Sequence, residues 1–348
     1  MKDDIKKKIN RRKFIKIVGG STICLGAATC LPHVEGDWSS CEDRELVEDL
    51  MPASHRVVEV SSANAVYEQD NKKIIVEEVV IEMFRAGLLA LKDQTTLAGA
   101  WNAVMPERQA GEKVALKANT LSPYVPTSPE LLGAIVGSLT DGPQIPAADI
   151  FVWDRRVDEL ESVDIVPARL GVECLGTIKS TSDLSGPGYE IEPACLSGRK
   201  IYFSKILTNG LDHLINVSVM KNHLASGFTG CLKNHYGSFS QPAKFHEGCE
   251  NHIAILNSLP EVASVSRLHI MDALIGVCMG NTHEPSDCTP ARLLLSFDPV
   301  AIDSRGLEVR DEMRAEAGMG AGLPAGYLAK AAELGLGITE FELVTLTI

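Results

Sequence analysis

The chain has 348 residues, of which 45% are hydrophobic and 23% charged, and its net charge at pH 7 is −13. This length allows a large core in one or two domains, and the composition is that of a globular protein rather than a disordered one. The charge is uneven, because residues 1–16 carry +6 and the remainder −19. Such an acidic body repels polyphosphate, so the sequence predicts no nucleic-acid partner.

A targeting segment is predicted at residues 1–36. Arg11 and Arg12, followed by Phe14, resemble the twin-arginine signal Arg-Arg-x-Phe-Leu-Lys, and an apolar run follows at 17–31. These fifteen residues give about 22 Å of helix, short of the roughly 30 Å hydrocarbon core of a bilayer. We therefore expect no stable transmembrane span in the mature protein. The resemblance implies that Arg11 and Arg12 engage the twin-arginine (Tat) translocation machinery and that the protein is exported to a periplasmic or other extracytoplasmic space; a chance basic start or an uncleaved anchor is the alternative.

After an acidic leader at 37–56, residues 57–348 are predicted to form a single α/β domain. Helices are expected over 74–91, from Ser128 as N-cap with Pro129 in the first turn, and over 299–314; strands are expected over 113–118, 149–154, 212–219, 267–274 and 291–297. Helices and strands alternate, and the strands are apolar on both faces. This pattern predicts a mostly parallel sheet with helices on both faces.

The residues that follow each strand matter most, since ligands of such sheets bind beyond the carboxyl ends of the strands. Lys221 and His223 follow the apolar strand at 212–219, and strand alternation turns both to the same side if the extended geometry continues. Lys233 and Asn234 come about three helical turns later if a helix begins near residue 224. The Ser-, Gly- and Thr-rich stretch between them would then offer an anion seat at a helix N-terminus.

Several blocks of the chain, in order, resemble those of the domain of unknown function 362 family: ALKANTLSP, LINVSVMKNHLASGFTGCLKNHYG, IMDALIG and FDPVAID. The resemblance implies an α/β fold and leaves the reaction open. It places the family's recurring polar positions on Lys117, Asn119, Lys221, His223, Lys233, Asn234, Gly237, Asp272, Asp298 and Asp303. Some relatives carry an appended two-cluster ferredoxin module, whose Cys motifs this chain lacks.

Lysine, asparagine and histidine together suit a carboxylate or phosphate group held beside a residue that transfers a proton. We predict that chemistry is carried by His223, Lys221, Lys233 and Asp272, and that the ligand or a cofactor is held by Lys117, Asn119 and Asn234. Asn222 and His235 fall outside the family pattern, and His235 is expected to lie outside the site. Asp298 is most simply an N-cap. The sequence identifies no cofactor.

Cys278, His283 and Cys288 form a cluster of soft ligands in one loop. A metal site, a disulfide and a plain loop are all compatible with this spacing, and the family pattern, which does not call for these cysteines, favours the plain loop. If a metal is bound, His223 with Asp272 is an equally suitable place for it.

The sequence contains no dinucleotide-binding, nucleoside triphosphate or nucleophile-elbow motif. It therefore predicts an exported α/β enzyme that acts on a small anionic substrate by acid–base or metal-assisted chemistry. The alternative is a non-catalytic protein that holds a metal or a redox cofactor in the same crevice.

Replacing both Arg11 and Arg12 by Lys should leave the precursor in the cytoplasm, because the resemblance assigns recognition to the arginine pair and not to positive charge alone. Cell fractionation followed by immunoblotting, with the unaltered precursor as control, measures the exported fraction. Unimpaired export of the double variant would contradict the twin-arginine assignment.

Overall fold

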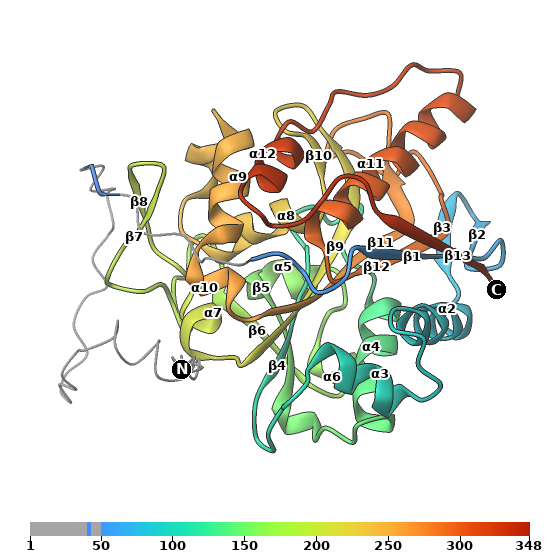
Figure 1. Cartoon of the computed structure of the whole chain (residues 1–348), viewed down its shortest axis with the longest axis horizontal. Helices are drawn as coiled ribbons and strands as arrows, with labels where there is room; N and C mark the ends of the chain where they lie inside the picture. Colours follow the sequence, from blue (N-terminus) through green and yellow to red (C-terminus); the bar gives the residue numbers. More distant parts are fainter. Residues whose placement is uncertain (1–39, 43–49) are drawn as a thin grey trace, which may run out of the picture. The chain divides into compact units, whose positions relative to one another are not determined.

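The computed structural model describes residues 40–42 and 50–348, and its centre is a nine-stranded sheet (Figure 1). The strand order is β13-β1-β12-β11-β9-β4-β5-β6, and β10 pairs with the far end of β9. The strands are β1 (Arg56–Ser61), β4 (Val114–Lys117), β5 (Ile150–Arg156), β6 (Glu173–Ile178), β9 (His213–His223), β10 (Gly227–Thr229), β11 (Ser266–Val277), β12 (Arg292–Ser296) and β13 (Glu342–Thr347). Only the pairs made by β12 and β10 are antiparallel in this sheet, so the predicted, mostly parallel α/β sheet is confirmed.

Helices cover both faces of the sheet (Figure 1). One face carries α2 (Glu77–Ala90), α3 (Leu97–Val104), α4 (Pro129–Asp141) and α6 (Pro167–Leu170). The other carries α8 (Cys231–Asn234), α9 (Cys249–Ser258), α10 (Pro260–Ala263), α11 (Pro299–Glu316) and α12 (Tyr327–Glu333). The remaining elements are α5 (Val157–Ser162), α7 (Lys205–Asn209), two hairpins, β2 (Val66–Gln69) with β3 (Lys72–Ile75) and β7 (Ala194–Leu196) with β8 (Arg199–Ile201), and 3-10 turns at Ala147–Asp149, His235–Ser238 and Pro242–Phe245.

The order of the strands reverses between β4 and β9. The chain passes from β4 outward to β5 and β6, then returns to lay β9 on the other side of β4 and continues to β11. Such a switch point leaves a crevice at the carboxyl ends of the two strands, where open α/β sheets bind ligands. Because β4 ends at Lys117, opposite Asn216 of β9, β9 projects beyond it to His223.

Two helix starts, one at each end of the sheet strands, show how local sequence acts. Asp298 caps α11 by accepting hydrogen bonds from the backbone N–H groups of Val300 and Ala301, each at 2.8 Å, so its prediction as an N-cap is confirmed. Ser128 precedes α4 as predicted, but its side chain accepts no hydrogen bond from that helix. It is held instead by a carboxylate of β11, described below.

The helix expected from residue 224 onward is absent, because β9 turns back at His223 and pairs with β10. Gly227 makes this turn possible. Its φ is +75°, and a Cβ placed there would lie 2.0 Å from the carbonyl oxygen of Pro324. Only the short α8 follows the hairpin, so Lys233 reaches the site from a different element than predicted.

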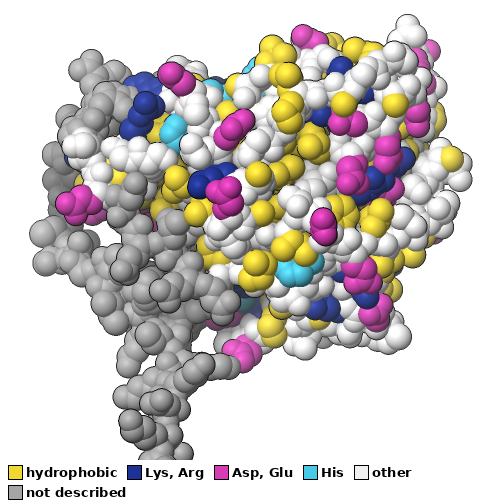
Figure 2. Space-filling view, turned by 45° about the horizontal axis from the view of Figure 1, so that its top comes forward, with side chains coloured by type: hydrophobic (Ala, Val, Ile, Leu, Met, Phe, Trp, Pro, Cys, Tyr) yellow, Lys and Arg dark blue, Asp and Glu magenta, His cyan; other side chains and the backbone are white. Residues whose placement is uncertain are grey.

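Arg11 and Arg12 lie outside the described residues. Among the residues that are described, no helix is both long and apolar enough to cross a bilayer. On the face drawn in Figure 2, acidic and basic side chains lie among one another.

We expect Gly227→Ala to lower the free energy of unfolding by more than about 2 kcal/mol, because left-handed strain adds to a backbone collision. Gly171→Ala is the matched control: φ is +71° there, but nothing lies within 4 Å of the added Cβ, so only the strain of about 1 kcal/mol applies. Urea unfolding compares the two. Equal losses would show that β10 does not approach Pro324 closely.

Candidate functional site

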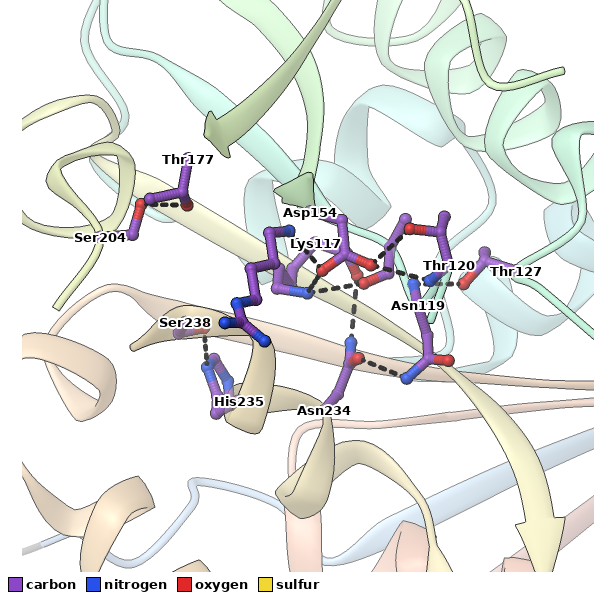
Figure 3. Close-up of polar contacts among 12 residues, drawn as sticks. Lys117, Asn119, Thr120, Thr127, Asp154, Thr177, Ser204, Asn234, His235 and Ser238 are labelled. Atoms are coloured by element: carbon purple, nitrogen blue, oxygen red, sulfur yellow. Dashed lines mark hydrogen bonds and ion pairs between the residues drawn. The ribbon is translucent and has the colours of Figure 1, made fainter. Parts of the chain in front are cut away.

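The predicted site residues lie around the crevice at the switch point, but they emerge from both faces of the sheet. Lys117 is paired with Asn216, and the two side chains lie on the same face of the sheet. Because side chains alternate along a strand, Lys221 lies on the other face, together with Val217 and Val219. Asn119, where the chain leaves β4, joins the two halves around the end of that strand. Four predicted residues are therefore connected by hydrogen bonds around this strand end: Lys117, Asn119, Lys221 and Asn234. Figure 3 shows Lys117, Asn119 and Asn234 of this group. Among the described residues, His223, Lys233 and Asp272 form no hydrogen bond with it.

Lys117 is already neutralised by the protein. Its side chain is 1% exposed, and its Nζ lies 2.5 Å from Asp154 Oδ1 and 5.2 Å from the centre of the Trp153 ring. The other Asp154 oxygen accepts hydrogen bonds from the backbone N–H and the hydroxyl of Thr120. Both oxygens of Asp154 are thus engaged within the protein, and the buried ion pair has a structural role. Lys117 therefore orders the loop after β4 and is not available to bind a ligand.

A chain of hydrogen-bonded carboxamides passes close to this pair, and Figure 3 shows its bond between Asn119 and Asn234. Lys221 Nζ donates to Asn119 Oδ1 at 2.9 Å, Asn119 Nδ2 to Asn234 Oδ1 at 3.1 Å, and Asn234 Nδ2 to Asn216 Oδ1 at 2.8 Å. Asn216 Nδ2 continues the chain to His269 Nδ1 at 3.3 Å. In each of these four hydrogen bonds the donor is the residue nearer to Lys221 along the chain and the acceptor is the next residue toward His269. Hydrogen bonds aligned in this way polarise one another.

Lys221 differs from Lys117 because no carboxylate of the described residues forms an ion pair with it. Its side chain is completely buried, and Asn119 Oδ1 is its hydrogen-bond acceptor. Burial lowers the pKa of Lys221 to about 7, although the more distant charges of Asp154 and Asp272 oppose the shift. Protonated and neutral forms of this amine therefore both exist near neutral pH.

Lys233 is the second cation without a counter-ion. It is 7% exposed, its Nζ lies 5.5 Å from the centre of the Tyr236 ring, and among the described residues it has neither a hydrogen bond nor an ion pair. Burial lowers the pKa of Lys233 to about 7; Cys249 opposes this shift, and the charge of Lys221 adds to it. Neither of these two buried lysines has a carboxylate as an ion-pair partner among the described residues.

His223 lies at the rim and is held in one tautomer. Its Nδ1 accepts hydrogen bonds from the backbone N–H groups of Ala225 at 3.0 Å and Ser226 at 3.2 Å, and its ring stacks on His246 at 5.4 Å. Burial, helped by the charge of Lys233, lowers the pKa of His223 to about 3. The ring is neutral with its proton on Nε2, so it offers a hydrogen-bond donor and its Nδ1 is not free to act as a base.

Two carboxylates of the predicted set hold helix starts. Asp272 Oδ2 accepts from the backbone N–H of Ser128 at 2.9 Å and from its hydroxyl at 2.7 Å, which fixes the beginning of α4. Asp303 accepts from the N–H groups of Cys231 at 2.6 Å and Leu232 at 3.1 Å. The anion seat predicted in this stretch is thus at the start of α8, and the protein's own Asp303 fills it.

The two histidines of the Lys-Asn-His repeats are placed differently. His235 is completely buried, with Nδ1 3.2 Å from Ser238 Oγ and with Nε2 lacking a partner in the described part of the chain. His223 is partly exposed at the tip of β9, whereas the turn after α8 carries His235 into the interior. That His235 has no part in the site stays a prediction.

The loop with Cys278 and Cys288 is not plain, since a disulfide joins these two residues. The two sulfurs and a carboxylate oxygen of Asp287 lie within 4.8 Å of one another, the one such group among the described residues. His283 is not part of it. Asp287 accepts three backbone N–H hydrogen bonds from residues 278–280, so its carboxylate shapes the loop. A second disulfide joins Cys41 to Cys195.

Four residues that build the site were not predicted from the sequence: Asp154, Asn216, Tyr236 and His246. Asp154 had a usable signal, because it ends the predicted strand 149–154 at the same sheet edge as Lys117. Asn216 is a polar residue inside an otherwise apolar strand, which also marks a buried hydrogen-bonding position. Tyr236 and His246 gave no such signal.

Fold and site together define an α/β protein with a cluster of lysines and amides at the switch point of its sheet. The sequence model described as "Domain of unknown function (DUF362)" matches residues 114–308, more than half of the chain, and this chain belongs to that family. The matched segment contains every residue predicted for the site.

Other comparisons add little. No curated protein matches the chain. A crystal structure of a Thermotoga maritima protein, solved by the Northeast Structural Genomics Consortium, is similar with a TM-score of 0.37 and 14% sequence identity; the match covers 75% of this chain and 59% of that one. This chain thus matches less than two thirds of the length of that structure.

We expect Asp154→Asn to lower the free energy of unfolding by about 3 kcal/mol or more, because Lys117 would remain buried without its partner. Asp141→Asn is the control, since Asp141 is 61% and its partner Arg85 44% exposed and such pairs contribute less than about 1 kcal/mol. Chemical denaturation at neutral pH compares them. Similar small losses would contradict a structural role for the Lys117–Asp154 pair.

Proposed function

We propose that this protein is an enzyme for a small anionic substrate, which binds between Lys233 and Lys221. The observation that carries the proposal is Lys233, a residue only 7% exposed whose Nζ has no hydrogen bond and no ion pair among the described residues. Removing an ammonium group from water costs several kcal/mol unless an anion or another acceptor compensates. A carboxylate or phosphate oxygen of a ligand would provide that compensation.

The pKa values support acid–base chemistry at this place. Lys221 and Lys233 each have a pKa of about 7, and groups that titrate near the working pH are the most effective proton donors and acceptors. A bound anion would favour the protonated form of the lysine it contacts and leave the other to give or take a proton.

The remaining predicted residues would have supporting roles. His223 offers its Nε2–H to the substrate as a neutral donor, which replaces the proton-transfer role inferred from the sequence. Asn119 and Asn234 fix the position of Lys221 through the carboxamide chain. Asp272 acts at a distance, by holding the start of α4 and by its negative charge near Lys221.

Export through the twin-arginine pathway forms part of the proposal. The two disulfides, Cys41–Cys195 and Cys278–Cys288, support it, since structural disulfides persist mainly in oxidising compartments. The alternative of a non-catalytic metal- or redox-cofactor-binding protein receives less support from the cysteine loop, because its two sulfurs are bonded to each other and not available as thiolate ligands.

Sulfate tests the anion site, because its charge is constant over the pH range of interest. Its affinity should be highest below pH 7 and fall by about tenfold per pH unit above 7 for each lysine whose proton is required. Ordinary lysines, with a pKa near 10.4, would give a flat profile over pH 6–8.5. Isothermal titration calorimetry at constant ionic strength measures the profile.

The variant Lys233→Met should abolish most of this binding, whereas Lys72→Met, at an exposed lysine, should not change it. A flat profile, or equal binding by both variants, would contradict the site. If sulfate binds as expected but small carboxylates and phosphate esters are only bound and never converted, the non-catalytic alternative is the better account.

A further inference from the structure

A cavity of about 180 Å³ lies at the end of the sheet strands opposite to the lysines. It adjoins the beginning of β11 and the end of β12, where Arg267, His269 and Phe297 reach it. Pro299 and Leu336 add apolar surface, and no Asp or Glu is among the residues that line it. This volume is below that of sites for drug-sized ligands, so the cavity fits a small molecule.

His269 gives the cavity a polar group that the protein leaves unused. The residue is 5% exposed, and its Nδ1 accepts a hydrogen bond from Asn216 Nδ2 at 3.3 Å. Its Nε2 has no hydrogen-bond partner in residues 40–42 and 50–348. This nitrogen is not among the fully buried atoms that lack a partner, so it is accessible from the cavity that the residue lines.

The tautomer of His269 follows from its neighbours. Asn216 Nδ2 also donates to the backbone carbonyl of Cys231 at 2.8 Å, and a carbonyl can only accept, so the orientation of this carboxamide is fixed. Nδ1 of His269 must then accept. Burial lowers the pKa of His269 to about 4, which leaves a neutral ring whose single proton is on Nε2. The cavity therefore contains a hydrogen-bond donor.

Arg267 adds a positive charge to the same cavity. Its guanidinium group donates to the backbone carbonyls of Ser264, Ser266 and Asp212 at 2.9–3.2 Å, which hold it at the cavity wall. A donor from His269 beside this charge suits an oxygen with negative charge, and the apolar wall suits a hydrocarbon group.

We propose that this cavity is a second ligand site, for a small and mostly apolar monocarboxylic acid. One carboxylate oxygen accepts from His269 Nε2–H and faces Arg267, and the hydrocarbon part packs against Phe297, Pro299 and Leu336. The hydrogen bond from His269 Nε2–H to the ligand oxygen would extend the chain that begins at Lys221. It would have the same donor-to-acceptor direction as the four hydrogen bonds between Lys221 and His269.

Hexanoate and hexan-1-ol are suitable probes, because they share a hydrocarbon chain and differ in the acid group. Titration calorimetry of the full chain should show saturable binding of hexanoate and much weaker binding of the alcohol. His269→Leu should weaken hexanoate binding by at least roughly tenfold, which corresponds to the lower end of the range for a hydrogen bond to a charged group. His252→Leu, at a buried histidine elsewhere, is the matched control and should bind hexanoate as the unaltered protein does.

Two further variants make the outcome decisive. Ala263→Leu narrows the cavity from its lining without altering His269, so it should also weaken binding and serves if His269→Leu does not fold. Lys233→Met removes the anion site at the lysines, where a carboxylate could also bind, so the hexanoate binding that remains in this variant should still be lost when His269→Leu is added. Loss of binding in Lys233→Met with retention in His269→Leu would place the acid at the lysines and overturn this proposal, while leaving the anion site intact. Absence of saturable binding, or equal binding of acid and alcohol, would overturn it as well.

Discussion

The ion pair between Lys117 and Asp154 is the interaction on which the rest of the site depends. It lies where β4 and β5 end, and the second carboxylate oxygen of Asp154 accepts a hydrogen bond from Thr120 in the loop after β4. That loop places Asn119, and Asn119 positions Lys221 from the neighbouring strand. Because both charges are buried, loss of either one leaves the other uncompensated, which makes this corner of the sheet rigid.

Acidic side chains near the crevice are almost all engaged with backbone or with Lys117. Asp272 holds the start of α4 and Asp303 that of α8, and Asp298 does the same for α11 at the opposite end of the strands. These carboxylates therefore accept hydrogen bonds at helix N-termini, where backbone N–H groups have no partner within the helix. Lys221 and Lys233 are left as cations without carboxylate partners in the described chain, which makes an anionic ligand the simplest complement.

A single chain of carboxamides connects the two ends of the central strands. It runs from Lys221 through Asn119, Asn234 and Asn216 to His269, so the amine at the crevice and the imidazole at the small cavity belong to one hydrogen-bonded system. Two of the three amide orientations are also fixed by a backbone carbonyl, that of Lys117 for Asn234 and that of Cys231 for Asn216. Asn119 is oriented by Lys221, whose ammonium group can only donate to it.

The sequence by itself determined the fold class and the set of polar residues at the crevice. Apolar strands such as 212–219 can only be buried on both faces, and the residues that follow parallel strands must gather at one edge. It did not determine the hairpin after His223, since that turn depends on how closely Gly227 approaches Pro324. Nor did it separate Lys117 from Lys221, two lysines at strand ends that look alike in sequence. Only the tertiary structure decided which one received Asp154 as a partner, because ion pairing depends on which strands become neighbours, and the local sequence carries no record of that choice.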